Sequence, residues 1–449
     1  MMKKIALLLA LCCLSAALFG QGRDAFEEIR QDPYRAGSVF YMYNHDGIPA
    51  HAAAPKGFKP FYISHYGRHG ARNHSANSDY ESVMALFSAA HQRGLLTGRG
   101  EEFLKRYRPV YEAIRGCGGD LTGLGREQQH KIAHNMYRNY PRVFRKNARI
   151  DAVSTIVPRC ILTMSAFAEQ LQHDNPRLQI DMQASNSTMG YLNPFSLSNP
   201  DIQPTDEGYN NKYAYWQKGY RQMCEQQQTP EAVFSPLLKD LSILEEFGGA
   251  RKLECDVFAI ALNAQCNEKV EKNLIEFIPY DELCKVFECY NYRFYCSKGA
   301  DTLWQKGRQW AFVWRTMQDI IDKADSDIST GEYAARLRFG HDIIAMSLFV
   351  LLDIDGYNKP VGKASEVKDV FRSYDFPMSL NIQFVFYRNC KGEILVRMMY
   401  NERDMALPIA DCGTPYYYRW EDLRAFALKR IEIAKGIIAS TQAPPKVKN

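Results

Sequence analysis

Three separate points of the sequence carry side chains of the types that bind and cleave phosphate esters. The first is "SHYGRHGARN" at residues 64–73, the second follows "DAVSTIVP", and the third is "FGHDIIAM". The side chains concerned are Arg68, His69, Arg72, Arg159, His341 and Asp342. Any one of them alone fits a solvated loop, a helix cap or a buried histidine, so the hypothesis of a site depends on their convergence.

Together these side chains can supply every function that hydrolysis of a phosphate monoester needs. Guanidinium groups grip phosphate oxygens through paired hydrogen bonds and neutralise charge on a transferred phosphoryl group. A neutral histidine can attack phosphorus and divide hydrolysis into two displacements. Asp342, when protonated, can give a proton to the leaving alkoxide and then act as a base toward water. We therefore expect an acidic pH optimum, because the carboxyl group must be protonated while the attacking imidazole stays unprotonated.

For these side chains to meet, the three junctions must lie at one edge of a sheet. Residues 61–65 alternate as in a strand, and Ser78 or Asp79 is expected to cap a helix that ends near Gly94. "DAVSTIVP" and "ARLRFG" also predict strands that lead into helices. In open α/β sheets the carboxyl ends of the strands line the ligand crevice, where helix N-termini favour anions.

Strands that alternate with helices predict an α/β fold with a mixed, mostly parallel sheet flanked by helices. Near residue 190 the composition shifts to Tyr, Gln, Asn, Cys and Glu with mostly helical periodicity. We predict that residues 21–190 and 331–449 form the α/β core and that residues 191–330 form a mainly helical cap. "LNIQFVFYRNCKGEILVRMMYNE" alternates on both sides of "NCKG", which indicates a β-hairpin, and a last helix is expected at 419–438.

The composition is that of an ordinary globular protein, since 46% of the 449 residues are hydrophobic and 24% are charged. The formal net charge of +5 becomes +3 without residues 1–20, which hold two lysines and no acidic residue. So small an excess does not favour nucleic acid as a partner. After the N-terminal segment no stretch approaches 18 consecutive apolar residues, so no membrane span is expected. The sequence indicates no particular oligomeric state.

Residues 1–20 have the pattern of a secretory signal peptide. A short basic stretch precedes an apolar run from Ile5 to about Leu18, and small residues follow. The run is too short to span a bilayer comfortably. We expect cleavage between Ala17 and Gln21, and therefore an exported protein that is periplasmic or secreted.

Cysteines are frequent in the remaining chain, at positions 117, 160, 224, 255, 266, 284, 289, 296, 390 and 412. In an exported protein the five between Cys255 and Cys296 predict one or two disulfide bonds in that stretch. A zinc site is the weaker interpretation, because there is no C-x-x-C pair and no histidine between His173 and His341. We predict no metal and no other cofactor.

Five motifs run in order across residues 58–403. They are R-H-G-x-R in "SHYGRHGARN", L-T-x-x-G-x-x-Q in "LTGLGREQQHKIAHNMYRNYP", an arginine segment in "STIVPRCILTMSAFAEQL", H-D in "FGHDIIAMSL", and the hairpin that begins "PMSLNIQFVFYR". Together they resemble the histidine acid phosphatases, the branch of the histidine phosphatase superfamily that contains phytases and multiple inositol polyphosphate phosphatases. The region at 191–330 is not specifically matched.

The resemblance implies a role for each candidate residue. His69 would be the nucleophile that becomes phosphorylated, and Asp342 would be the proton donor. The phosphate would be bound by Arg68, Arg72, Arg159 and His341. The implied fold is a phosphoglycerate-mutase-like α/β core with a helical cap over the cleft. The implied substrate is a small anionic phosphomonoester, and the reaction would need no metal or other cofactor.

The sequence departs from the family pattern at two places. Many members have a proline shortly after R-H-G-x-R, whereas Asn73 and His74 follow here. Inositol polyphosphate phosphatases typically show H-A-E, whereas this chain has the H-D form of acid phosphatases and many phytases. We rank inositol hexakisphosphate and related polyphosphates first as substrates, and broad activity on sugar phosphates or nucleotides second. Basic residues that would widen the entrance, unless they are ordinary solvated charges, are Lys56, Lys59, His74, Arg93 and Arg99.

Two rival classes of protein fit part of the pattern. A metal-dependent phosphohydrolase is one, because His45-Asp46 and His341-Asp342 resemble metal-ligand pairs, although histidine is scarce after residue 173. A non-catalytic phosphate-binding protein is the other, since three arginines can hold an anion without turning it over. The presence of both His69 and Asp342 favours catalysis.

Overall fold

The computed structural model describes residues 23–196, 199, 202, 215–303 and 307–441, so the predicted signal peptide lies outside the described residues. A single sheet has the strand order β3-β2-β4-β1-β5-β6-β7, and β8 pairs with β6. The strands are β1 (Lys59–Arg68), β2 (Arg149–Ser154), β3 (Gln179–Ala184), β4 (Ala335–Gly340), β5 (Asn381–Arg388), β6 (Ile394–Tyr400), β7 (Arg403–Asp404) and β8 (Tyr418–Arg419).

The sheet is mixed, as the sequence predicts. Strands β3, β2, β4 and β1 run parallel to one another. Strand β5 is antiparallel to β1, and β6 is antiparallel to β5, so the predicted hairpin around "NCKG" is confirmed. Parallel neighbours need a crossover through a helix, whereas antiparallel neighbours need only a turn. All four parallel strands precede the hairpin strands in the chain, and β1 and β5 are neighbours where the two halves of the sheet meet.

Fifteen α-helices accompany the sheet in the described part of the chain. They are α2 (Ala25–Gln31), α3 (Asn77–Gln92), α4 (Gly98–Ile114), α5 (Gly123–Asn139), α6 (Pro158–Asp174), α7 (Met189–Leu192), α8 (Tyr215–Gln227), α9 (Pro230–Phe234), α10 (Ala250–Asn263), α11 (Tyr280–Lys298), α12 (Arg308–Ala311), α13 (Trp314–Thr330), α14 (Asp342–Leu351), α15 (Val367–Val370) and α16 (Trp420–Thr441). Among them, no helix is both long and apolar enough to cross a membrane.

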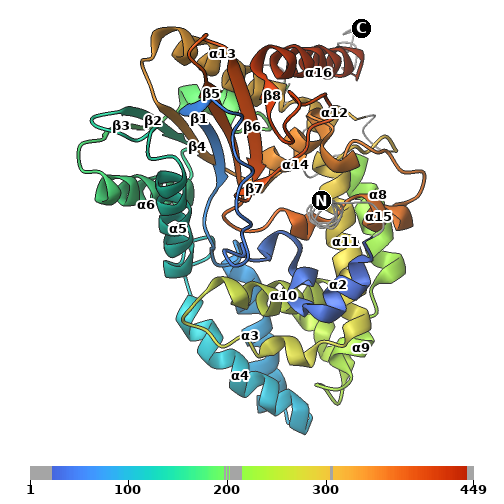
Figure 1. Cartoon of the computed structure of the whole chain (residues 1–449). Coiled ribbons are helices and arrows are strands. Elements are labelled where there is room, and N and C mark those ends of the chain that lie inside the picture. Colours follow the sequence, from blue (N-terminus) through green and yellow to red (C-terminus); the bar gives the residue numbers. More distant parts are fainter. Residues whose placement is uncertain (1–22, 197–198, 200–201, 203–214, 304–306, 442–449) are drawn as a thin grey trace, which may run out of the picture.

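Helices cover both faces of the sheet because the buried strands are apolar on both sides. In β1, Ile63 packs in the cluster formed with α5 and α6, whereas Tyr62 and Tyr66 pack in the cluster formed with α13, α14 and α16. Successive side chains of a strand point to opposite faces, which explains this division. Figure 1 shows α5 and α6 on one side of the sheet and α13 and α16 on the other. The predicted α/β fold with flanking helices is confirmed.

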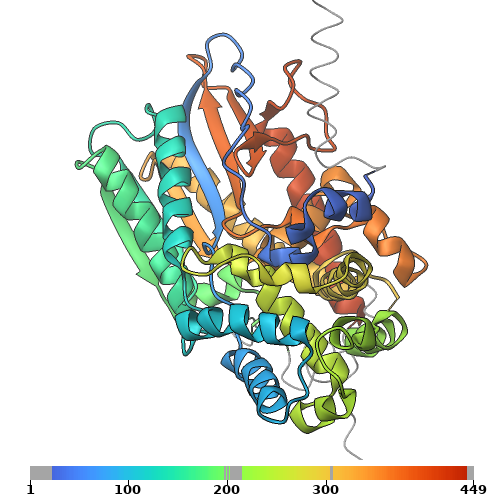
Figure 2. The ribbon, with the colours of Figure 1, turned by 90° about the horizontal axis from the view of Figure 1, so that it is seen from below.

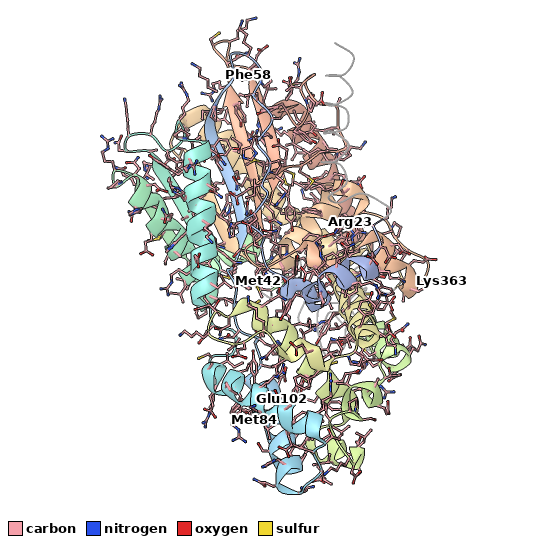
Figure 3. The ribbon with its side chains drawn as sticks, turned by 60° about the horizontal axis from the view of Figure 1, so that its bottom comes forward. Arg23, Met42, Phe58, Met84, Glu102 and Lys363 are labelled. Carbon is pink, nitrogen blue, oxygen red and sulfur yellow. The ribbon has the colours of Figure 1, made fainter. Side chains whose placement is uncertain are left out.

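A separate helical layer lies beyond one end of the sheet, below it in Figure 1 and toward the viewer in Figure 2. Its apolar cluster joins α2, α3, α4, α9, α10 and the first half of α11, and we call this layer the cap. Figure 3 places Met84 of α3 and Glu102 of α4 at this end and Phe58, just before β1, at the opposite end. The second half of α11 instead packs in the cluster that includes β1 and α14. Helix α11 therefore connects the cap with the core.

The cap draws on more of the chain than residues 191–330, the segment that we predict as an insertion. Val83 and Phe87 of α3 pack in the same cluster as Phe103 of α4 and Phe258 of α10. Helix α13, which ends that segment, packs against β1 and α16 instead. Boundaries of the core and the cap at residues 190 and 330 stay a prediction.

One predicted helix start is wrong. Helix α3 begins at Asn77, its N-cap residue is Ala76, and no side chain caps it. Ser78 and Asp79, the expected caps, lie inside the first turn. Asp79 instead accepts a hydrogen bond from His74 at 2.7 Å, so its carboxylate serves the preceding loop rather than the helix end.

The expected disulfide bonds are absent: each of the ten cysteines in the described residues is a free thiol. Cys284, Cys289 and Cys296 follow one another along α11, where five residues already rise about 7.5 Å. That spacing is too long for a bond between neighbours in the sequence. Cys284 packs in the cap, whereas Cys289 and Cys296 pack in the core cluster. The thiol of Cys289 forms its hydrogen bond with Cys224 of α8.

A buried carboxyl group in the cap predicts a pH-dependent stability. Glu254 of α10 is fully buried, and neither of its oxygens has a hydrogen-bond partner among the described residues. Burial raises the pKa of Glu254 to about 8, and the neighbouring Glu282 acts in the same direction. A carboxyl group whose pKa is raised by folding stabilises the fold when it is protonated. That stability is complete below its unfolded pKa near 4.5 and is lost as the pH rises to about 8.

The replacement Glu254→Gln is therefore expected to raise the melting temperature at pH 8 and to leave it nearly unchanged at pH 4.5. The gain at pH 8 corresponds to a free energy of unfolding on the order of 2 kcal/mol, because an amide carries no charge to bury. Thermal unfolding of both proteins at several pH values measures it. Glu245→Gln, at an exposed position, is the matched control. Parallel curves for Glu254→Gln and the unmodified protein would contradict the assignment.

Candidate active site

The three polar junctions meet at one edge of the sheet because β2, β4 and β1 are adjacent parallel strands. Arg68 pairs in register with Gly340, and Ser154 pairs with Phe339, so all three strands end at the same level. Arg159 lies in the first turn of α6, directly after β2. The side chains that follow these three strand ends are thus carried to one place by the sheet register.

The turn after β1 is held by close backbone packing against the start of α5. A Cβ atom at Gly70 would lie 2.3 Å from the carbonyl oxygen of Gly125, and one at Gly125 would lie 2.2 Å from the carbonyl oxygen of Ala71. Neither position has room for a side chain. Gln128 of α5 accepts a hydrogen bond from the amide of Ala71 at 3.0 Å, and Thr163 of α6 accepts one from the amide of Gly70 at 3.1 Å. These contacts fix the backbone that carries His69.

The imidazole of His69 has one nitrogen engaged and one available. Nδ1 lies 2.9 Å from the carbonyl oxygen of Gly70. A carbonyl oxygen only accepts hydrogen bonds, so Nδ1 carries the proton and Nε2 carries the lone pair. The side chain is buried, and burial lowers the pKa of His69 well below its ordinary value; the Arg68 and Arg72 guanidinium groups act in the same direction. The imidazole therefore stays neutral in mild acid, as a nucleophile requires.

Three guanidinium groups surround this imidazole. Arg68 is buried at the end of β1, where it donates to the carbonyl oxygens of Val39 and Phe376 at 2.6 and 3.1 Å. Burial lowers the pKa of Arg72 to about 10, and Arg68 and Arg159 act in the same direction. The Nε atoms of all three arginines are buried without a hydrogen-bond partner among the described residues. Such unpaired donors are costly, which suits a site that receives an anion.

His341 stands beside His69, with 5.7 Å between the ring centroids and the planes at 74°. It is the N-cap residue of α14, but its side chain does not cap the helix, so the imidazole is free to face the site. Its backbone is held by Tyr66, whose hydroxyl accepts from the His341 amide at 3.0 Å. Burial lowers the pKa of His341 to about 4, with Arg159 acting in the same direction. At pH 5 this imidazole is also neutral.

Asp342 is the first residue of α14 and is mostly buried. Its Oδ2 forms an ion pair with Nη2 of Arg68 at 3.0 Å, and its Oδ1 accepts from the amide of Ile343 at 2.9 Å. The positive end of the helix dipole lies next to this carboxylate. Asp342 is thus tied to Arg68, the last residue of the central strand.

The structure brings all six predicted site residues together. With both imidazoles neutral, the three guanidinium groups give the site a positive charge, which suits a phosphate dianion. The arrangement can bind a phosphoryl group, present an unprotonated Nε2 to it, and hold a carboxyl group nearby. These are the requirements of in-line phosphoryl transfer to histidine.

Of the five basic residues proposed to widen the entrance, His74 lies in the loop just after Arg72, and the other four are not gathered there. Lys59 begins β1, and a ten-residue strand places it about 30 Å from Arg68 at the other end. Arg93 forms a paired contact with Glu246, and Arg99 donates to the carbonyl oxygen of Glu276. Their charges are satisfied locally on the surface of the cap. Lys56 precedes β1 at its distant end.

Asn73 and His74, which replace the proline usual in the family, fasten the loop to the cap. The side chain of Asn263, at the end of α10, accepts from the amide of His74 at 2.7 Å and donates to the carbonyl oxygen of Arg72 at 3.1 Å. Asn267 donates to the side chain of Asn73 at 2.8 Å. Asn73 itself donates to the carbonyl oxygen of Cys117. Side-chain amides therefore hold this loop in place.

Sequence reasoning missed several residues that support the site. Gln129 and Gln128 of α5 bracket the hydroxyl of Ser379, at 3.0 and 2.7 Å, and the amide of Ser379 donates to the carbonyl oxygen of His69. The L-T-x-x-G-x-x-Q motif was the signal that could have found the glutamines. Lys298, the last residue of α11, lies within the electrostatic reach of Asp342. No motif marks it, since a lysine at a helix C-terminus is ordinary.

Comparison with known proteins gives one family and several similar folds. The family described as histidine phosphatase superfamily (branch 2) matches residues 67–401, most of the chain. Among solved structures, the multiple inositol polyphosphate phosphatase of Bifidobacterium longum in complex with phosphate has a TM-score of 0.72 at 17% identity, over 89% of this chain and 98% of that one. The same enzyme in complex with inositol hexasulfate gives 0.70 at 17% identity, over 87% and 96%. A search of curated protein sequences gives no significant match.

A phytase from D. castellii has a TM-score of 0.66 at 16% identity, over 89% of this chain and 85% of that chain. At such low identities the structural likeness concerns the fold alone, so the family match carries the relationship. The residues matched by the family, 67–401, include the turn after β1, the start of α6 and the junction of β4 with α14, where the six site residues lie.

Proposed function

The chain belongs to the histidine phosphatase superfamily, branch 2, and we propose that it is an exported phosphomonoester hydrolase acting on inositol hexakisphosphate or other inositol polyphosphates. Family membership makes it a phosphatase for a small phosphate ester. The observation that carries the mechanism is the hydrogen bond from His69 Nδ1 to Gly70, which leaves Nε2 unprotonated among three guanidinium groups. Export rests on the signal-like residues 1–20.

The reaction proceeds in two displacements. His69 Nε2 attacks phosphorus, the bond to the alcohol oxygen breaks, and Asp342 gives that oxygen its proton. Water then attacks the phosphohistidine while the Asp342 carboxylate accepts its proton, and the nitrogen–phosphorus bond breaks to release inorganic phosphate. Arg68, Arg72 and Arg159 hold the phosphoryl oxygens throughout both steps, with His341 beside them.

The choice of inositol polyphosphates rests on charge and on the relatives. The guanidinium groups favour a highly anionic ligand, and Lys298 adds a further cation near Asp342. Two similar solved structures are of a multiple inositol polyphosphate phosphatase, one of them with inositol hexasulfate, and another is of a phytase. Broad activity on sugar phosphates or nucleotides is the alternative outcome.

A substrate panel tests this choice. Inorganic phosphate released from inositol hexakisphosphate, glucose 6-phosphate and AMP is measured at pH 4 to 7, with and without a chelator. We expect the highest kcat/KM for inositol hexakisphosphate and no loss with the chelator. Equal or faster hydrolysis of glucose 6-phosphate and AMP would replace the proposal by a broad-specificity acid phosphatase, and a loss with the chelator would favour a metal mechanism.

The pH profile is expected to have its maximum in mild acid. Toward low pH the rate falls near pH 4, because His341 gains a proton as the pH drops through its lowered pKa of about 4 and adds a positive charge beside His69. Toward high pH it falls because the leaving oxygen must still receive a proton. Initial rates at saturating substrate from pH 3 to 9 measure both limbs. A flat profile from pH 4 to 9 would rule out a carboxyl donor.

A further inference from the structure

Lys298 is a cationic residue at the C-terminal end of α11. It lies on the side of the site where Asp342, the proposed proton donor, is found. It is the last residue of that helix, and its carbonyl oxygen accepts a hydrogen bond from the buried hydroxyl of Ser347 at 3.0 Å. Ser347 lies on α14, the helix that begins with Asp342. The end of α11 is therefore fixed relative to the proposed proton donor.

Among the described residues, Lys298 has an aromatic ring beside its charge but no carboxylate at ion-pair distance. Its ammonium group lies 3.8 Å from the ring centroid of Phe195. Burial lowers the pKa of Lys298 to about 7; Asp342 acts against this shift, and Arg293 adds to it. No carboxylate in the described part of the chain lies within ion-pair distance of Lys298, and Asp342 pairs with Arg68. A partly buried ammonium group without a paired anion is costly, so an anionic ligand next to it is favourable.

The position of Lys298 decides which part of a substrate it meets. The scissile phosphate lies among the arginines and His69, and the leaving oxygen must face Asp342 to receive its proton. The alcohol that carries this oxygen therefore lies on the side of Asp342. Among the described residues, Lys298 is a further cation on that side besides Arg68, so it meets a substituent of the leaving alcohol rather than the phosphate that is transferred.

We propose that Lys298 is a specificity-determining residue that binds a second phosphate on the leaving alcohol and so favours esters with a neighbouring phosphate over simple monoesters. This inference rests on the proposed function for its catalytic steps, but it concerns only the difference between substrates with and without that second phosphate. The charged and titratable groups that face Lys298 are Asp342 of α14 and Arg293 of α11, and Phe195 supplies the aromatic face.

The test compares inositol 4,5-bisphosphate with inositol 4-phosphate, which differ by one neighbouring phosphate. In Lys298→Met the ratio of kcat/KM for these two esters is expected to fall about tenfold or more, because a charge-assisted contact is lost. Lys298→Arg, which keeps a positive charge, should retain most of the preference. Lys359→Met, at an exposed position, is the matched control and should leave the ratio unchanged.

The pH dependence separates a charge contact from a structural role. In the unmodified enzyme the preference for the bisphosphate should weaken between pH 6 and pH 8, as Lys298 loses its proton, and in Lys298→Met it should stay constant. An equal loss for both esters, or an enzyme that does not distinguish them, would overturn the inference. Failure to hydrolyse inositol hexakisphosphate while the bisphosphate is preferred would instead overturn the proposed substrate and leave the role of Lys298 supported.

Discussion

Replacing His69 by alanine is expected to reduce hydrolysis of every phosphomonoester by on the order of 10⁴-fold or more, because the reaction then lacks its nucleophile. Alanine leaves the three guanidinium groups and Asp342 in place, so phosphate binding should persist. The geometry gives no substitute, since His341 Nε2 lies near the thiol of Cys160 at 3.9 Å and its ring is turned 74° from that of His69. Binding without turnover is thus the expected state of this variant.

The covalent intermediate gives a second and independent measurement. The enzyme is mixed with substrate and denatured rapidly in alkali, where phosphohistidine is more stable than in acid, and its intact mass is determined. The unmodified enzyme should carry one phosphoryl group, and His69→Ala should carry none. His173→Ala, at an exposed position on α6, is the control and should behave like the unmodified enzyme. Comparable turnover by His69→Ala, or a phosphoryl group on it, would sink the assignment of the nucleophile.

The three strand ends explain why the sequence predicts these site residues. Arg68, Arg159 and Asp342 are far apart in the chain, but Arg68 ends a strand, and Arg159 and Asp342 lie in the first turns of helices that follow strands. In parallel strands that are neighbours in a sheet, such positions converge by topology alone. The sequence need not specify a distance for this argument, because the register of β2, β4 and β1 supplies it.

Other features depend on tertiary packing, which local patterns do not show. Ser78 and Asp79 look like helix caps, but the loop before them is bound by Asn263 of α10, and the helix begins earlier. The cysteines between Cys255 and Cys296 look like a disulfide cluster, but their helices bury them in different apolar clusters. Spacing along the chain is a poor guide wherever helices turn neighbouring residues to different faces.

Lys298 illustrates the same limit for the site. Its importance follows from the contact between the end of α11 and α14, two helices whose mutual position no motif encodes. The cap also includes α3 and α4, which directly follow the loop of His69. The change of amino-acid composition near residue 190 therefore does not show which helices form the cap. The core strands can be predicted because the sequence repeats a pattern of a strand followed by a helix. The packing of the cap instead depends on the shapes of individual side chains.

The variant Asp342→Asn is expected to separate substrates by their leaving groups. An asparagine has nearly the same shape and can still accept a hydrogen bond from Arg68, but it has no proton to give. For inositol hexakisphosphate, whose alkoxide is a poor leaving group, kcat/KM should fall by about 10² to 10⁴-fold. For 4-nitrophenyl phosphate, whose phenolate leaves without a proton, kcat/KM should change less than about tenfold, since this constant reports the first displacement.

The second displacement gives the same variant a further signature. Asp342 also accepts the proton of the attacking water, so in Asp342→Asn the phosphohistidine should accumulate when the aryl ester is the substrate. Rapid mixing should then show a burst of nitrophenolate equal to the enzyme concentration, followed by slow turnover, whereas Asp369→Asn, at an exposed position, should show steady turnover at the normal rate. An equal fall in kcat/KM for both esters would mean that Asp342 only positions Arg68, through their ion pair at 3.0 Å, and that another group supplies the proton.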